Sequence, residues 1–402
     1  MKSPELMSPV GNFDMLQAAI DSGANAVYFG VQKLNMRATA KNFTLEDLPK
    51  ITALCKECNV KTYLTVNTIV YENELKDLEI ILKAAKEANI DMIICWDLSV
   101  LKQAKNLGLK VCMSTQASIS NSESAKFYKD LGADRVVLAR ECTLDQIKDL
   151  KKNVDIEIET FIHGAMCVSV SGRCFLSHHL FNRSANRGDC LQPCRREYLI
   201  KDGEEDGNEL LLGKDYVMSP KDLCTIEIID QLINAGIDSL KIEGRKRSPE
   251  YVAAVTQAYR KAIDLHFENK LTPQIKSKLK KDLETVFNRG FSTGFYLGLP
   301  TKEDYVENRN SLATTKKEYI GTVSNYFKKI NVASLKLHSG SLEVDNEILI
   351  QGPKTGSLKF KISNLRHKDK SIKKALKGQE ISFELDQESR KGDKVYIIKK
   401  LK

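Results

Sequence analysis

The sequence has no uninterrupted run of about 18 apolar residues, the length that a helix needs to cross a lipid bilayer. Its N-terminus, Met1-Lys2-Ser3-Pro4-Glu5, also lacks the apolar core of a secretory signal. We therefore expect a cytoplasmic protein with no membrane partner. The ten cysteines would then lie in a reducing compartment, where structural disulfides are rare and clustered thiols usually bind metal or take part in catalysis.

Two functional motifs are also missing. No Gly-x-Gly-x-x-Gly follows the first predicted strand, which argues against an open sheet that binds a dinucleotide. No His-Glu-x-x-His occurs, so the usual helix of a zinc protease is absent.

Basic charge is concentrated at one end of the chain. Of the 62 Lys+Arg and 53 Asp+Glu residues, 20 and 10 respectively follow residue 315, and the preceding residues are close to neutral. A basic module on a neutral body suggests a polyanionic partner such as nucleic acid, although a solvated lysine-rich surface would have the same composition. Our candidates for contacts to an RNA backbone in this module are Lys368, Lys370, Lys373 and Lys374.

Short apolar strands alternate with amphipathic helices over the first 270 residues. The strands are nearly continuously apolar, as parallel strands covered on both faces should be. Eight such units predict an α/β fold of the TIM-like (β/α)8 barrel type. The predicted strands are Glu5–Val10, Ala26–Val31, Lys61–Asn67, Met92–Asp97, Lys110–Gln116, Arg135–Arg140, Glu157–Gly164 and Ser239–Gly244.

The chain divides into three parts by pattern. Residues 1–300 form the barrel, 301–317 a linker, and 318–402 a small basic β-barrel domain whose short strands alternate apolar and polar residues. An insertion at 165–221 follows the seventh strand, where a loop of about two to six residues is usual. Loops that follow barrel strands gather at one end, so we expect the insertion to overhang the barrel mouth.

The insertion carries four cysteines in the spacing Cys-x6-Cys-x15-Cys-x3-Cys, namely Cys167, Cys174, Cys190 and Cys194. Thiolates are soft ligands that suit zinc or iron–sulfur clusters. Structural zinc usually takes two tight Cys-x-x-Cys pairs, and here only the last two cysteines are close. The spacing therefore favours an iron–sulfur cluster, with zinc and a chance grouping as alternatives. Among the other cysteines, Cys224 is predicted on a buried helix face.

The same region resembles the signature of the peptidase U32 family. The matching stretches are Glu159–Ser177, Gly188–Arg195, the opening Glu5–Gly11 and Lys241–Arg245, and the likeness extends over nearly the whole chain. The family name records a collagenase-like protease. The resemblance also implies a [4Fe–4S] cluster and oxygen-independent hydroxylation, of ubiquinone precursors, a ribosomal RNA cytidine or the wobble uridine of tRNA.

In length and domain organisation the chain is most similar to the tRNA type, which makes 5-hydroxyuridine with prephenate as oxygen donor. The resemblance then implies tRNA and prephenate as partners, with a second protein of the same family as a further possible partner. It also implies that the four cysteines hold the cluster. Arg195 and Arg196 are additional candidates for RNA contacts. The alternatives are a U32-type collagenase-like peptidase and an iron–sulfur electron carrier.

Polar residues at the ends of the predicted strands complete the candidate site. Because prephenate is a dicarboxylate, basic side chains suit its binding, and our candidates are Arg140, Lys241, Arg245 and Arg247. Candidate catalytic residues are Glu159, His163 and Glu243. The alternative interpretation is an internal ion network for the charged residues and a core position for the histidine.

Overall fold

The structure is a computed structural model that describes residues 2–38, 42–196, 198–201, 209–211, 218–306, 311–368 and 370–401. Parts of the predicted insertion and of the predicted linker lie outside the described residues.

Eight parallel strands close into a barrel, as predicted. Each strand pairs with the next in chain order, and β11 pairs with both β1 and β7 to complete the ring. The barrel strands are β1 (Glu5–Pro9), β2 (Ala26–Gly30), β3 (Lys61–Thr65), β4 (Met92–Cys95), β5 (Val111–Met113), β6 (Arg135–Val137), β7 (Glu157–Gly164) and β11 (Ser239–Ile242).

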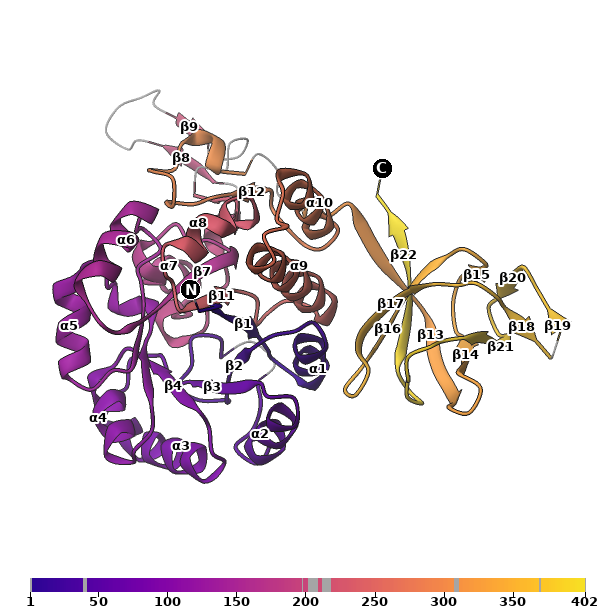
Figure 1. Cartoon of the computed structure of the whole chain (residues 1–402), viewed down its shortest axis with the longest axis horizontal. Coiled ribbons are helices and arrows are strands. Elements are labelled where there is room, and N and C mark those ends of the chain that lie inside the picture. The colour runs from indigo at the N-terminus through magenta and orange to yellow at the C-terminus, as the bar shows by residue number, and fades with distance from the viewer. Residues whose placement is uncertain are drawn as a thin grey trace.

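Helices alternate with these strands and form the outer layer in Figure 1. Several begin at a side-chain cap: Asn12 accepts from the backbone N–H of Met15, and Thr143 forms a capping box with Gln146. The helices of the barrel are α1 (Phe13–Asp21), α2 (Leu48–Glu57), α3 (Leu75–Glu87), α4 (Leu98–Asn106), α5 (Ser122–Asp130), α6 (Leu144–Asn153), α8 (Ile229–Asn234) and α9 (Pro249–Phe267), and α10 (Pro273–Glu284) packs against α9.

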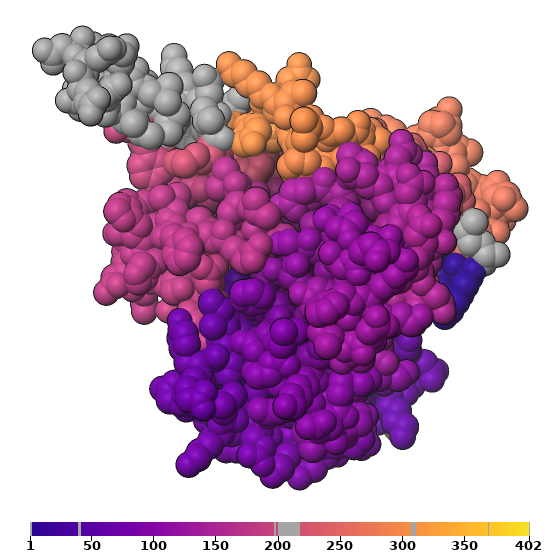
Figure 2. Space-filling model, turned by 90° about the vertical axis from the view of Figure 1, so that its left-hand side faces the viewer, coloured from indigo at the N-terminus to yellow at the C-terminus, as the bar shows by residue number. Residues whose placement is uncertain are grey.

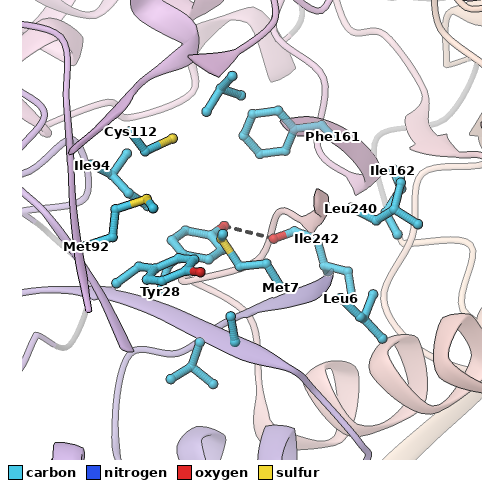
Figure 3. Packing of buried hydrophobic residues seen from close by; sticks show 14 of the residues in the cluster. Leu6, Met7, Tyr28, Met92, Ile94, Cys112, Phe161, Ile162, Leu240 and Ile242 are labelled. Atoms are coloured by element: carbon cyan, nitrogen blue, oxygen red, sulfur yellow. Dashed lines mark hydrogen bonds between the residues drawn. The ribbon is translucent and has the colours of Figure 1, made fainter. Parts of the chain in front are cut away.

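The barrel interior is filled by side chains from its strands. Figure 3 shows Tyr28 of β2 among Met7, Met92 and Ile242, with its hydroxyl donating to the Ile242 carbonyl at 2.9 Å. Tyr28 is buried, and so are its apolar neighbours. This layer fills part of the barrel interior, as in other packed barrels of this type.

Two short strands extend the sheet beyond the barrel. β10 (Asp222–Cys224) pairs antiparallel with the end of β7, and β12 (Phe291–Ser292) pairs with β10. The prediction that Cys224 lies on a helix is therefore wrong. The long strand β7 leaves an edge at His163 and Gly164, and the chain that returns from the insertion pairs with this edge before α8 begins.

The insertion consists of short elements in its described part: η3 (Val170–Gly172), α7 (Leu176–Phe181), η4 (Ala185–Arg187), η5 (Pro193–Arg195), β8 (Leu199–Lys201) and β9 (Glu209–Leu211). In Figure 2 its cysteine-bearing segment, in pink, projects from one side of the barrel.

The C-terminal residues form antiparallel sheets with their own hydrophobic core, beside α1 and α9 in Figure 1. Lys317 and Gln351 of this domain both bind the Glu250 carboxylate of α9, at 2.9 and 2.8 Å. The strands are β13 (Thr315–Phe327), β14 (Val332–Leu337), β15 (Ser341–Glu343), β16 (Glu347–Gly352), β17 (Gly356–Lys361), β18 (Arg366–His367), β19 (Lys370–Ser371), β20 (Lys374–Leu376), β21 (Glu380–Glu384) and β22 (Lys394–Lys400). Among the described residues no helix has the length and apolarity of a membrane span.

Candidate functional site

A cavity of about 240 Å³ opens at the carboxyl ends of the barrel strands. Part of its wall is the start of the insertion, from Met166 to Gly172, which includes Cys167. The remaining wall comes from strand ends and from the loop after β2. Five basic side chains line the cavity: Arg37, Arg140, Lys221, Lys241 and Arg245. Such a concentration of positive charge in a concave site favours an anionic ligand.

Glu243 and Arg37 form the ion pair of this cavity. An Nη of Arg37 donates to the Glu243 carboxylate at 2.8 Å. Burial alone would raise the pKa of Glu243, but the charge and hydrogen bond of Arg37, with the charges of Arg140 and Arg247, lower it to about 2. Glu243 is therefore ionised at neutral pH. It neutralises one guanidinium and cannot donate a proton.

Arg245 is buried and has no carboxylate partner among the described residues. Its guanidinium donates to Thr65 Oγ1 at 2.9 Å and lies 3.4 Å from Asn35 Oδ1. Burial lowers the pKa of Arg245 to about 10; the positive charge of Arg37 acts in the same direction, whereas Tyr28 and the charge of Glu243, which is not within ion-pair distance, oppose it. A buried cation without an anion is unfavourable, and a ligand carboxylate in the cavity would supply the missing charge.

The other predicted binding residues differ in their surroundings. Arg140 lies over the Phe161 ring, 3.9 Å from its centroid, and donates to the Ala165 carbonyl at 2.7 Å. Lys241 lines the cavity but pairs with Glu159 at 2.8 Å. Arg247 lies outside the cavity wall, over the Phe287 ring.

Glu159 belongs to an ion network inside the barrel. It is fully buried and contacts Lys241, Ser239 and Arg135, the last at 3.2 Å. Arg135 also binds Glu5 at 2.8 Å. Glu159 does not line the cavity, so its surroundings match the ion-network interpretation.

His163 is a core residue by position. Its ring packs against Tyr251, Tyr259 and Phe291, and it does not line the cavity. Burial, aided by the charge of Arg247, lowers the pKa of His163 to about 3. The imidazole is thus neutral over the physiological pH range, so the imidazolium form that acts as a general acid is absent, which matches the core interpretation.

Three cysteines of the insertion, Cys167, Cys174 and Cys190, lie within electrostatic range of the fourth, Cys194. Burial raises the pKa of Cys194; Arg195 opposes this effect, and Cys167, Cys190 and Cys174 add to it. Backbone N–H groups approach two of the sulfurs, from Leu176 to Cys174 and from Gln192 to Cys190, both at 3.4 Å. Such N–H groups stabilise thiolates that bind metal.

Within the described part of the chain, no three His, Cys, Asp or Glu side chains converge closely enough to hold a single metal ion. A cluster differs from a single ion because its own iron and sulfide atoms occupy the space between the ligands. Cysteine thiols with backbone N–H donors, as at Cys174 and Cys190, are ligands of the type that clusters take.

One arginine attaches the insertion to the barrel, and a second joins the two ends of the insertion to each other. Arg187 binds the Ile69 carbonyl and the Glu74 carboxylate. Arg195 donates to the Met166 carbonyl at 2.7 Å and to Ser219 Oγ at 2.6 Å. Gly188 has a φ of +89°, and a Cβ there would lie 2.5 Å from the Asn35 carbonyl oxygen. The cysteine-bearing segment is thus held against the loop that carries Arg37.

The predicted RNA-contacting residues fall into two groups. Arg195 makes the internal contacts just described, whereas Arg196 is exposed and lies over the Phe181 ring. In the C-terminal domain, all four candidate lysines are exposed, and one of them, Lys374, pairs with Glu343 at 2.7 Å.

Sequence analysis did not identify three residues of this cavity. Arg37 lies in a loop without periodicity, where no sequence signal marks it. Glu141 lines the cavity, and its Oε2 is a buried atom without a hydrogen-bond partner in the described chain. Ser292 lies within Gly290-Phe291-Ser292-Thr293-Gly294, a match to the Gly-x-Ser-x-Gly pattern of serine hydrolases. This match could have been found by inspection of the sequence.

The fold and the site define a (β/α)8 barrel with a cysteine-bearing insertion beside a cationic cavity. Residues 11–305 match the family model for peptidase family U32, and the chain belongs to this family. It is 42% identical over 98% of both chains to a protein of Porphyromonas gingivalis named collagenase.

Two further relatives carry names that refer to RNA. The chain is 37% identical to tRNA hydroxylation protein P1 of Bacillus subtilis, over 96% of this chain and 92% of that protein. It is 36% identical to 23S rRNA 5-hydroxycytidine C2501 synthase of Escherichia coli, over 66% of this chain and 40% of that protein.

Proposed function

We propose that this protein is an iron–sulfur-dependent RNA hydroxylase that converts the wobble uridine of tRNA to 5-hydroxyuridine, with prephenate as oxygen donor. The main support is one juxtaposition: a four-cysteine insertion borders a cavity with an unpaired buried guanidinium. The similarity to tRNA hydroxylation protein P1 over almost the whole chain adds the substrate class. An RNA substrate also accords with a cytoplasmic location.

Cys167, Cys174, Cys190 and Cys194 would hold the [4Fe–4S] cluster. A bound cluster supplies redox or Lewis-acid chemistry at the cavity rim. Cys167 is itself part of the cavity wall, so chemistry at the cluster would take place beside the bound donor.

The basic side chains would bind and orient the donor. A ligand carboxylate would pair with Arg245, whose hydrogen-bond partners are neutral, and Arg140 lies on the same wall. Arg37 is already neutralised by Glu243 and would set the position of the second carboxylate. Because Arg37 neutralises the charge of Glu243, an ionised Glu243 is compatible with a site that binds a dianion.

Glu141 would orient the base. Its unpartnered Oε2 can accept a hydrogen bond, and the N3–H of uracil is a donor. Its other oxygen, Oε1, accepts from the Ser171 backbone N–H at 3.0 Å, which fixes the carboxylate in the wall. Lys368, Lys370, Lys373 and Lys374 would bind the RNA backbone at a distance from the chemistry.

The second candidate function is a U32-type peptidase, which the collagenase relative favours. Peptidase chemistry needs a nucleophile activated by a neighbouring base. The Ser292 hydroxyl donates to Asp304, and no described histidine forms a hydrogen bond with Ser292. The His163 Nδ1 lies 3.4 Å from the Tyr259 hydroxyl, and no hydrogen bond joins a described histidine to a cysteine. These arrangements do not form an activated nucleophile.

The test is nucleoside analysis of tRNA from a strain that lacks the gene. We expect 5-hydroxyuridine and its derivatives to disappear and to return with the wild-type gene, but not with Arg245→Gln. Unchanged tRNA nucleosides in the deletion strain would refute the proposal that the wobble uridine of tRNA is the substrate. Cleavage of collagen peptides by Cys174→Ser protein at the wild-type rate would favour a peptidase activity independent of the cluster.

A further inference from the structure

The cysteine-bearing segment exposes an apolar surface beside the cavity. Phe175, directly after Cys174, is 76% exposed, and Val170, which lines the cavity, is 61% exposed. Leu180 and Leu191 of the same segment are each 41% exposed. Phe175 has no ring or cation–π partner among the described residues. Exposed apolar residues that gather on one segment beside a cavity are candidates for a binding surface.

Arginines give this surface its charge. Residues 165–196 contain five arginines, no lysine and a single acidic residue, Asp189. Arg173 lies two residues before Phe175 and Arg183 eight residues after it, and both are exposed. Arg196 is exposed over the Phe181 ring. Asp189 lies 3.8 Å from Arg183 and offsets one of these charges. The surface therefore combines a free aromatic face with excess positive charge.

We infer that Phe175, with Arg173 and Arg183, forms a stacking platform for an unpaired RNA base next to the base in the cavity. The platform rests on the proposed function, which supplies an RNA partner. An aromatic face without a protein partner suits stacking on a nucleobase, and the arginines suit the adjoining phosphates. Three of the five arginines, Arg173, Arg183 and Arg196, are exposed. Protein interfaces are also enriched in aromatic residues and arginine, but the RNA partner of the proposed function makes a nucleobase the occupant.

The position of the platform explains how the substrate reaches the cavity. A base inside a duplex cannot enter a pocket, so the enzyme must hold a strand whose bases are splayed apart. A neighbour stacked on Phe175 would keep the strand open beside Val168–Gly172, the part of the segment that lines the cavity. The platform therefore selects single-stranded loops over duplex RNA.

The test is the binding of fluorescein-labelled oligouridylate to the full-length protein without donor, so that no turnover occurs. We expect Phe175→Ala to raise the Kd about 5- to 150-fold, because stacking contributes about 1–3 kcal/mol per base. Phe175→Trp should keep the wild-type Kd. Phe327→Ala is the control, because Phe327 is 45% exposed but lies at the end of β13 in the C-terminal domain.

Two further readouts separate stacking from charge. A 2-aminopurine next to the target uridine should lose fluorescence on the wild-type protein and keep it on Phe175→Ala. Arg173→Gln should reduce the slope of log Kd against log salt by about 0.7, whereas Phe175→Ala should leave it unchanged.

Equal Kd values for the wild type and Phe175→Ala would overturn the platform. Equal affinity of the wild type for duplex RNA and for single-stranded oligouridylate would also overturn it. Stacking without any change of tRNA nucleosides in the deletion strain would support the platform and refute only the hydroxylase proposal.

Discussion

The guanidinium of Arg37 binds the Glu243 carboxylate at 2.8 Å, across the mouth of the barrel. Arg37 comes from the loop after β2 and Glu243 follows β11, so the pair joins segments that are 206 residues apart in sequence. It fixes the charge of Glu243 and the position of one wall of the cavity.

Arg37→Gln should destabilise the protein by about 2 kcal/mol at neutral pH, because it leaves a buried carboxylate without its main partner. The folded-state pKa of Glu243 is about 2, below the ordinary value of 4.5. The ionised Glu243 therefore contributes on the order of 3 kcal/mol to the free energy of unfolding above about pH 4.5, and this contribution is lost as the pH falls towards 2. Urea unfolding at several pH values should show that the difference in free energy of unfolding between the wild type and Arg37→Gln narrows below pH 4.5.

The control is Lys33→Gln, which removes an exposed ion pair with Asp77 and should change the free energy of unfolding little. A pH-independent difference would contradict this account.

Glu159→Gln should lower the free energy of unfolding by about 3 kcal/mol, because Lys241 would remain buried without its carboxylate. Glu157→Gln is the matched control: Glu157 also binds Arg135, but its side chain is 46% exposed, so its loss should have little effect. Chemical denaturation of both variants measures the difference. A Glu159→Gln protein of wild-type stability that had lost activity would instead assign Glu159 to catalysis.

Arg245→Gln should weaken the binding of prephenate about 10- to 150-fold, from the loss of a charge-assisted hydrogen bond of about 1.5–3 kcal/mol. Its stability should be equal to that of the wild type or higher, because the substitution removes a buried cation without an anionic partner. Calorimetric titration and urea unfolding measure the two effects. Arg260→Gln, on the outer face of α9 with its Asp264 pair, should bind prephenate normally. Wild-type affinity in Arg245→Gln would remove this residue from the donor site.

Cys174→Ser should abolish bound iron and sulfide, together with the brown colour expected of anaerobically purified wild-type protein. Cys58→Ser is the control, because Cys58 is exposed at the end of α2 and far from the insertion in sequence. Analysis of metal and sulfide in both variants measures the effect. Colourless wild-type protein with stoichiometric zinc would refute the cluster and favour the zinc alternative.

The barrel could be predicted because its pattern is local. Each strand is a short apolar run, and a glycine such as Gly23 or Gly132 ends the helix before it with a positive φ. Strand ends were less certain. The predicted strand Lys110–Gln116 is only Val111–Met113 in the structure, since Thr115–Ala117 forms a 3-10 turn. β10 escaped prediction because it depends on the free edge of β7, which no local pattern reveals.

The candidate site was predictable only in part. Arg140, Lys241, Glu243 and Arg245 could be selected because they follow strands, and all of them line the cavity. The same rule also selected His163, whose side chain points among aromatic rings instead. Arg37 and Glu141 could not be distinguished from other charged loop residues.

By itself, the sequence determined the alternation of strands and helices, the four cysteines of the insertion and the basic C-terminal module, because composition and spacing are properties of the chain. Only the tertiary structure decided which charges pair and which remain without a partner. Burial and pairing depend on residues far apart in sequence: Glu159 acquires Arg135 and Lys241, whereas Arg245 faces the cavity with no carboxylate of its own among the described residues.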